Sequence, residues 1–475
     1  MAVLQGSGME GMRDTVREKL ADPALQAALA RALGIVRGKR DAALAELASF
    51  EDAVAAASAV RRQAVQRLKD YLPALESKLV GEGTHVLWAA DAAEACRKVV
   101  DIARRHSVRR CVMSKSMVAE EVGLEAALKA AGTLVIQSDL GERVVQLARQ
   151  RPSHITAPCI HLSAAEVGRI LHDKSGVELS ADPEKLSRSV ARALRPVFFD
   201  AAMAVSGANF AVAESGHLVL VENEGNGRMG YTLAPVHVVV MGLEKVVGTL
   251  KDAGTLLSVL GRSATGQRTT CYVSFLPPQP FPGQERFVVI VDNGRTDAFE
   301  AGPMRDVLRC IRCGACMNAC PVYERVGGHT YGWTYPGPIG IVLAPFLGPE
   351  EVRGEIADLC SLCGACTEVC PVGIPLDRLI VTARGMSHRH RAPKVVQKER
   401  FALRWFARAM GGRAGYRLSH FGHRLAGRWM PERLRRMEIA LGWGGTRTAP
   451  RPAADLFRTR FRKRRSLPQE VPDGD

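Results

Sequence analysis

Eight cysteines in the C-terminal half of the chain are spaced like the ligands of iron–sulfur clusters. They form two runs with one pattern, C-x2-C-x2-C-x3-C-P, and each cysteine of the second run follows its counterpart by 50 residues. Three thiolates of such a run wrap one face of a [4Fe–4S] core, and the fourth ligand comes from elsewhere. The first run contains Cys310, Cys313, Cys316 and Cys320, and the second contains Cys360, Cys363, Cys366 and Cys370.

This repeat predicts two [4Fe–4S] clusters that exchange one ligand each. In two-cluster proteins the cysteine before the proline ligates the other cluster. We therefore expect Cys370 to complete the cluster of the first run and Cys320 to complete that of the second. Zinc is the alternative, but a repeated four-cysteine run is hard to arrange tetrahedrally around one ion. Gly314 and Gly364 let the backbone approach the sulfurs, so that amide hydrogen bonds can tune the reduction potential. Two such clusters indicate a protein that moves electrons.

The other cysteines and the N-terminus bear on the compartment. Cys96, Cys111, Cys159 and Cys271 stand singly in expected helices or strands, where a buried apolar cysteine is the usual case. The first twenty residues show no apolar stretch behind a basic start, and no apolar run reaches the roughly 18–20 residues of a membrane span. We therefore expect a cytoplasmic protein whose thiols stay reduced.

Changes in composition divide the 475 residues into four expected parts. Residues 1–82 indicate an N-terminal helical arm, 83–298 an α/β domain, 299–385 a mostly helical, ferredoxin-like two-cluster domain, and 386–475 a basic helical segment with a disordered tail. The net charge of +16 resides in the last part, because residues 384–465 hold 23 Lys and Arg against four acidic residues. This positive charge favours an acidic redox partner, and no nucleic-acid motif accompanies it.

Seven short apolar runs in the second part predict β-strands. Helical stretches over Asp91–Arg105 and Val118–Ala131 lie between the first of them. The alternation predicts an α/β fold with a largely parallel sheet that is covered on both faces. The expected strands are Val86–Ala89, Arg110–Met113, Thr133–Gln137, His217–Glu222, His237–Met241, Thr270–Phe275 and Phe287–Val291.

Two glycine-bearing segments of the α/β domain predict a pocket for a substrate or another anion. The first has the composition of a loop and turn whose backbone amides hold a carboxylate or phosphate. The second is a polar turn directly after a buried strand, where α/β sheets usually place their sites. The alternative is that both are solvated turns without a ligand. The expected pocket residues are Gly207, Asn209, Glu214, Gly216, Glu222 and Asn226.

Four further side chains are candidates for acid–base chemistry or substrate binding. His154, His161 and His237 lie near strand ends, and histidine titrates close to neutral pH. Lys115 has the charge to bind an acidic substrate. Structural histidines and a surface lysine are the alternatives, so the residues alone assign no catalytic group.

The C-terminal basic segment begins with an amphipathic helix. Phe401, Trp405 and Met410 fall at helical spacing among arginines. Such a helix docks on a partner, packs on the protein's own domains, or makes peripheral contact with a membrane surface.

Several motifs of the chain together resemble a known family. They are Ser114–Met117, Glu120–Leu124, Ser138–Glu142, Pro152–Ile155, Gly207–Glu214, Val221–Asn226, Val236–Lys245 and Gly337–Gly340. With the cysteine runs, they resemble the lactate-utilisation protein B family from about residue 10 to 445. Gln137, Ser138 and Arg143 depart from the residues common in that family, which leaves the exact substrate open.

The resemblance implies a LUD domain, similar in fold to the ribose-phosphate isomerase and CoA-transferase group. It also implies an iron–sulfur subunit that oxidises L-lactate to pyruvate with two companions, a cysteine-rich protein and a second LUD protein. No flavin or nicotinamide motif is evident, so the redox acceptor stays open. Two alternatives remain: the LUD domain itself acts on a hydroxy acid or related carboxylate, or the chain is an iron–sulfur redox sensor.

Overall fold

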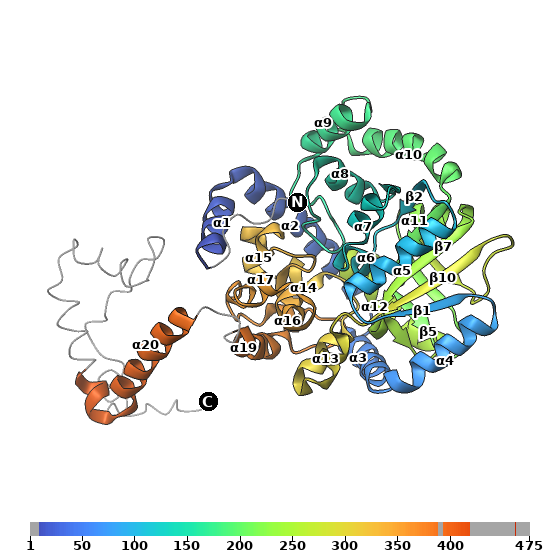
Figure 1. The fold of residues 1–475 in the computed structure, drawn as a ribbon. Helices are drawn as coiled ribbons and strands as arrows, with labels where there is room; N and C mark the ends of the chain where they lie inside the picture. The colour runs from blue at the N-terminus through green and yellow to red at the C-terminus, as the bar shows by residue number, and fades with distance from the viewer. Residues whose placement is uncertain (1–8, 388–392, 419–460, 462–475) are drawn as a thin grey trace, which may run out of the picture. The chain divides into compact units, whose positions relative to one another are not determined.

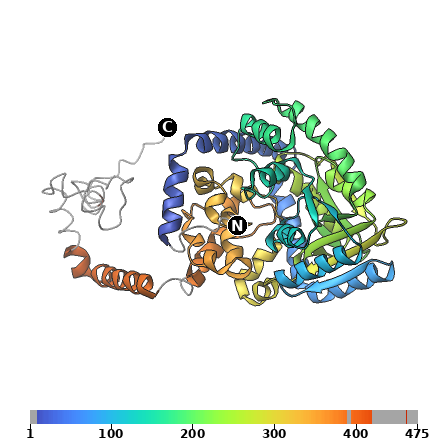
Figure 2. The same cartoon turned by 45° about the horizontal axis from the view of Figure 1, so that its top comes forward.

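The computed structural model describes residues 9–387, 393–418 and 461, and Figures 1 and 2 show the chain as a ribbon from two directions. Helices and strands up to residue 387 belong to one unit, and helix α20 (Pro393–Gly411) belongs to a second. Helix α20 confirms the expected helix at the start of the basic segment. Most of the expected tail lies outside the described residues. Within the described ranges, every helix is too short or too polar to cross a lipid bilayer.

A six-stranded parallel sheet is the framework of the first unit. Its order is β1-β10-β7-β4-β2-β3, and every neighbouring pair is parallel. The strands are β1 (His85–Ala89), β2 (Arg110–Met113), β3 (Leu134–Gln137), β4 (Met203–Ser206), β7 (Val236–Gly242) and β10 (Glu285–Val291). The expected α/β fold with a largely parallel sheet is therefore confirmed.

Both faces of this sheet are covered, which explains the continuous apolar sequence of its central strands. All of β7 is buried, and its alternate side chains serve different layers. Val238 and Val240 pack with α5 and α7, whereas Val239 and Met241 pack with α4 and a second sheet.

Gly123, with φ of +73°, divides the single helix expected at 118–131 into two. The helices of this region are α5 (Ala92–Arg105), α6 (Met117–Glu121), α7 (Leu124–Ala130), α8 (Leu140–Ala148), α9 (Ala164–Ser175), α10 (Pro183–Asp200), α11 (Asn226–Leu233) and α12 (Leu250–Thr265).

A second, four-stranded sheet corrects the expectation of one sheet. Two of the expected strands, which became β6 (Leu218–Glu222) and β9 (Tyr272–Leu276), pair antiparallel with each other in it. Strands β5 (Phe210–Val212) and β8 (Val246–Val247) complete the order β8-β5-β6-β9. Strands β4, β5 and β8 were not predicted, because each has at most four residues and no polar alternation.

Residues 9–81 are almost entirely helical, as expected. The helices are α1 (Met9–Ala21), α2 (Pro23–Ala45), α3 (Phe50–Gln66) and α4 (Leu68–Gly81). Asp22 caps α2, with Pro23 at its first position, and Leu29 and Leu33 on its inner face are fully buried. Helix α2 packs on both α12 and α15 (Pro321–Val326), and Figure 1 shows the dark blue helices beside golden α15. These helices therefore join the α/β layers to the cysteine region.

Short helices carry the cysteine region. They pack in one hydrophobic core with α2, α3 and α12. Their bounds are α13 (Arg295–Glu300), α14 (Ala315–Asn318), α15 (Pro321–Val326), α16 (Gly337–Leu347), α17 (Glu350–Arg353), α18 (Ala365–Glu368) and α19 (Leu376–Ser387), with 3-10 turns η1 (Leu243–Lys245), η2 (Gly302–Arg309), η3 (His329–Tyr331) and η4 (Ile356–Asp358).

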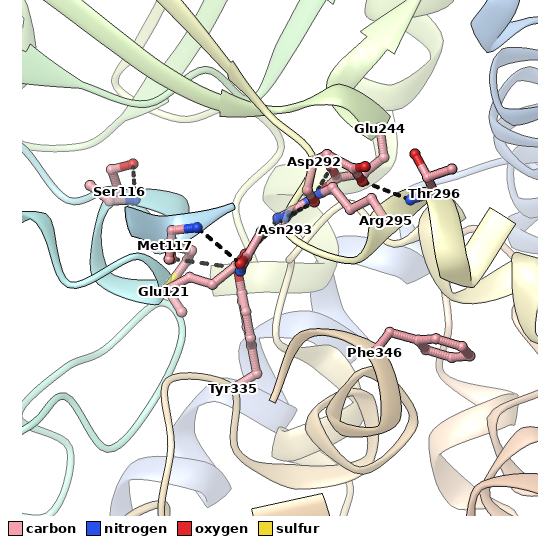
Figure 3. A network of polar contacts seen from close by, with 12 residues as sticks. Ser116, Met117, Glu121, Glu244, Asp292, Asn293, Arg295, Thr296, Tyr335 and Phe346 are labelled. Carbon is pink, nitrogen blue, oxygen red and sulfur yellow. Dashed lines mark hydrogen bonds and ion pairs between the residues drawn. The ribbon is translucent and has the colours of Figure 1, made fainter. Parts of the chain in front are cut away.

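A buried network of charges joins the sheet to the cysteine region (Figure 3). Arg295, just after β10, donates two hydrogen bonds of 2.8 Å to Glu121 and one of 2.5 Å from Nε to Glu244. Tyr335, between the cysteine runs, donates to Glu121 at 2.7 Å. All lone pairs and protons of such a group must be satisfied when it is buried, so the network fixes the relative positions of these segments.

Replacing Arg295 by methionine should destabilise the protein strongly. The substitution leaves Glu121 buried without its cation and Glu244 with only the more distant Arg312, and breaking a buried pair costs about 3–5 kcal/mol. Thermal unfolding followed by circular dichroism, at matched iron content, would measure the change. The control Arg268→Met removes the exposed ion pair with Glu46 and should leave the midpoint nearly unchanged. An equal effect of the two substitutions would contradict the prediction.

Candidate functional site

Electrostatic interactions link the eight cysteines in two groups, each with one member from the other run. The thiolate charges that act on Cys316 come chiefly from Cys310, Cys313 and Cys370. The corresponding partners of Cys366 are Cys360, Cys363 and Cys320. These groups are the two ligand sets expected from the repeat, and the ligand roles stay a prediction.

Burial, together with neighbouring thiolates, raises the pKa of Cys316 and Cys366. The pKa of Cys366 rises to about 12, and that of Cys316 lies well above its usual value. A thiol must lose its proton to bind metal, so such groups ionise only against a strongly positive core. The donor set therefore fits a [4Fe–4S] core, whose iron ions supply that charge.

The two runs share their backbone geometry. Arg312 and Leu362 occupy matching positions, both with positive φ (60° and 57°). Each donates its backbone N–H to the preceding cysteine sulfur, Cys310 or Cys360, at 3.3 Å. Gly314, with φ of +79°, turns the next amide toward Cys313. Amide–sulfur hydrogen bonds of this kind stabilise charge on a cluster's ligands.

A pocket of about 290 Å³ lies at the carboxyl ends of the parallel strands. Ser114 follows β2 and Gly207 follows β4, and both line it. A Cβ on residue 207 would lie 2.9 Å from the Ser116 hydroxyl, so glycine permits the close approach of these loops. Part of the wall comes from the first cysteine run, because Arg312 lines the same pocket. The substrate-sized space and the first cysteine group therefore adjoin.

Four of the six expected pocket residues line this space, and two do not. Those in the wall are Gly207, Asn209, Glu222 and Asn226. Glu214 and Gly216 instead form the tight turn between β5 and β6, where the Gly216 amide donates to the Val212 carbonyl at 2.8 Å. These two lie apart from the pocket because β5 carries the chain away from the loop at Asn209.

One side of the pocket is acidic. Glu222 accepts hydrogen bonds from the Gly227 and Arg228 amides, and burial raises its pKa. Burial, helped by the charge of Asp139, raises the pKa of Glu224 to about 7. Because these carboxylates line the pocket together, they are suited to accept hydrogen bonds from hydroxyl groups of a ligand.

The sequence analysis missed two basic residues of the pocket, Lys245 and Arg312. Both are 8% exposed. Burial lowers the pKa of Lys245 to about 8, against the opposing charge of Glu244. Although burial also opposes ionisation of Glu244, the charges of Arg295, Lys245 and Arg312 hold its pKa at about 2. A signal for Lys245 existed, since it lies just beyond the carboxyl end of a predicted strand.

The three candidate histidines have structural partners, and none is among the described residues that line the pocket. His154 accepts two backbone amides at Nδ1 and donates from Nε2 to Asn318 in the first cysteine run, at 3.0 Å. His237 lies 2.8 Å from the Ser206 hydroxyl, and His161 is hydrogen-bonded at both ring nitrogens. Burial lowers the pKa of His154 and His161 to about 4 and that of His237 to about 3.

Lys115 and the four single cysteines have simpler surroundings. Lys115 lines the pocket, but its ammonium is ion-paired with Glu142. Cys111 is buried, and Cys96 and Cys159 are partly buried, which agrees with packing roles. Cys271 is exposed, which corrects its expected burial, because it precedes β9 at the edge of the second sheet.

Comparison with known proteins decides the family. The chain is 37% identical over 468 residues, 97% of each protein, to the uncharacterized electron transport protein YkgF of Escherichia coli (strain K12). It is 36% identical to lactate utilization protein B of Bacillus pumilus (strain SAFR-032), with 97% of this chain and 99% of the relative covered. Lactate utilization protein B of Bacillus thuringiensis (strain Al Hakam) is also 36% identical, with 94% and 95% covered. The chain belongs to the lactate utilisation protein B family.

Family models place two domains in this lactate utilisation protein B relative. A LUD domain matches residues 72–290, and a 4Fe-4S dicluster domain matches residues 306–374. The chain therefore binds two [4Fe–4S] clusters, and the zinc alternative is set aside. Among solved structures, a DUF162 family protein from Deinococcus radiodurans matches 47% of this chain and 98% of its own, at 15% identity and a TM-score of 0.28.

Substitution of Cys370 tests the ligand exchange in this member of the family. Cys370→Ser should lower iron from about eight to about four atoms per chain and remove the same paramagnetic resonance signal as Cys310→Ser, because both would ligate one cluster. Cys271→Ser, at an exposed cysteine outside both groups, should keep all iron. If Cys370→Ser instead matches Cys360→Ser, the ligand exchange is wrong.

Proposed function

We propose that this chain is the iron–sulfur electron-transfer subunit of a cytoplasmic complex that oxidises L-lactate to pyruvate. Its companions would be a cysteine-rich protein and a second LUD protein. The observation that supports this most is the dicluster domain packed against a LUD pocket in a chain similar along almost its whole length to proteins named lactate utilization protein B. When bound, the clusters supply one-electron chemistry, which suits a relay for the two electrons of lactate.

The surroundings of the two cysteine groups support a division of tasks. Arg312 in the first run is buried and lines the pocket, whereas Leu362 at the matching position is 42% exposed. Cys363 beside it is also exposed. The first group is thus suited to the substrate side, and the second, at the surface, to exchange of electrons with a partner protein.

L-Lactate added to the anaerobically purified protein tests the proposal. The visible absorbance of the clusters should bleach when both companions are present and stay unchanged when the chain is alone. D-Lactate serves as the control and should give no bleaching. Bleaching of the isolated chain would overturn a pure relay role, and no bleaching in the complete set would overturn lactate as the electron source.

A charge at Leu362 should slow electron exchange with the partner. Leu362→Glu places a carboxylate on the exposed apolar surface beside Cys363, and we expect the rate of reduction through the companions to fall about tenfold, the effect of 1.4 kcal/mol. Iron content should not change. The matched control is Leu179→Glu, at another exposed leucine, which should leave the rate unaltered. Equal rates for the two variants would refute the role of this surface.

A further inference from the structure

Two buried cations in the pocket have hydrogen-bonding capacity that the described residues leave unused. The Lys245 ammonium feels the opposite charges of Glu244 and Cys310, but it makes no side-chain hydrogen bond or ion pair within the described part of the chain. Arg312 Nη1 is also buried without a hydrogen-bond partner. Removing a cation from water is costly unless an opposite charge or acceptor compensates it. An anion in the pocket would supply that compensation.

Other basic groups of the region are already paired. Lys115 is ion-paired with Glu142, and Arg295 with Glu121 and Glu244. The open charges therefore belong to two residues only among the described lining of the pocket, where Lys115, Lys245 and Arg312 are the cations.

Arg312 is held in place for a ligand. Its Nη2 lies 3.6 Å from Glu244 Oε1, and its guanidinium carbon lies 4.7 Å from the centroid of the Tyr335 ring. An ion pair on one side and a cation–π contact on another fix the guanidinium plane while Nη1 stays open. A preoriented donor loses little entropy on binding, which favours a small anion with matching geometry.

We propose that Lys245 and Arg312 bind a small carboxylate in the LUD pocket, and that its binding is coupled to the charge of the adjoining iron–sulfur cluster. The site deepens the proposed function but does not require lactate to be oxidised here. The volume of about 290 Å³ suits a compact acid. The carboxylates Asp139, Glu222 and Glu224 in the same wall disfavour a multiply charged anion such as phosphate and favour a monocarboxylate with a hydroxyl group.

Coupling follows from the position of Arg312 in the chain. It stands between Cys310 and Cys313, and its guanidinium both lines the pocket and interacts electrostatically with Cys310. The charge of Cys310 also acts on Lys245. A bound anion must therefore disfavour an added electron on this cluster, and reduction must weaken anion binding by the same factor. A tenfold difference in affinity corresponds to about 59 mV for a one-electron couple.

The test uses the full chain with its clusters and 2-hydroxyisobutyrate, a hydroxy acid without the α-hydrogen that oxidation to a keto acid removes. Calorimetry gives its Kd for the oxidised protein. A redox titration followed by electron paramagnetic resonance gives the potentials of both clusters with and without the acid. Lys245→Met removes one open cation, and Lys251→Met removes an exposed one on α12 as the matched control.

We expect the acid to lower the reduction potential of one cluster and to leave the potential of the other cluster unchanged. Lys245→Met should raise the Kd about tenfold or more and abolish the shift, whereas Lys251→Met should change neither. Equal behaviour of the two variants, equal shifts of both clusters, or displacement of the acid by inorganic phosphate at similar concentration would each overturn the proposal.

If Lys245→Met does not fold or loses iron, the redox titration of the wild-type protein alone tests whether binding of the acid is coupled to the cluster. A shift of one signal supports the coupled site, and no binding or no shift refutes it. Because the probe undergoes no redox chemistry, these outcomes are independent of whether L-lactate reduces the complex.

Discussion

The carboxylate of Glu244 is the interaction on which the arrangement of this protein depends. It follows β7 in η1 and pairs with Arg295 from the end of β10 and with Arg312 from the first cysteine run. Arg61 of α3 donates to the Glu244 backbone carbonyl at 2.7 Å and to carbonyls just before the cysteines. One residue thus joins the sheet, the N-terminal helices and the cysteine region. Such a buried anion is stable only with these cations in place, so the segments position one another.

This constraint brings a pocket of the α/β type against a redox module. Parallel sheets leave their binding crevice at the carboxyl ends of the strands. Here the loop of Cys310–Cys313 closes part of that crevice through Arg312. The buried network around it holds Arg61, Lys245, Arg295 and Arg312 against Glu121 and Glu244, an excess of positive charge. Thiolate-ligated clusters are negative, so part of this excess stabilises their charge, while Arg312 Nη1 stays without a hydrogen-bond partner.

Features that depend on local sequence patterns, such as the cofactor and the longer strands, could be predicted. Features that depend on tertiary contacts, such as the second sheet, could not. The cysteine spacing identified the cofactor, and apolar runs separated by helical stretches located β1, β2, β3, β7 and β10. The second sheet could not be foreseen, because β5 and β8 have three and two residues and are strands only through their neighbours. Lys245 was visible merely as a lysine after a strand. The surroundings of its ammonium group are set by η1, the first cysteine run and the pocket, so they are known only from the tertiary structure.

The two cysteine runs share their backbone geometry but lie in different surroundings. Arg312 and Leu362 share a left-handed conformation and an amide–sulfur bond of 3.3 Å, so the local geometry of the two groups is alike. Their side chains differ: one is a buried cation facing a pocket, and the other is an exposed apolar group beside Cys363. A nearby positive charge favours an added electron on a cluster, and exposure to solvent also tunes its potential. The exchange of arginine for leucine is one of five differences between the two runs, and it gives repeats of one local geometry a pocket-facing charge on one side and an apolar surface on the other.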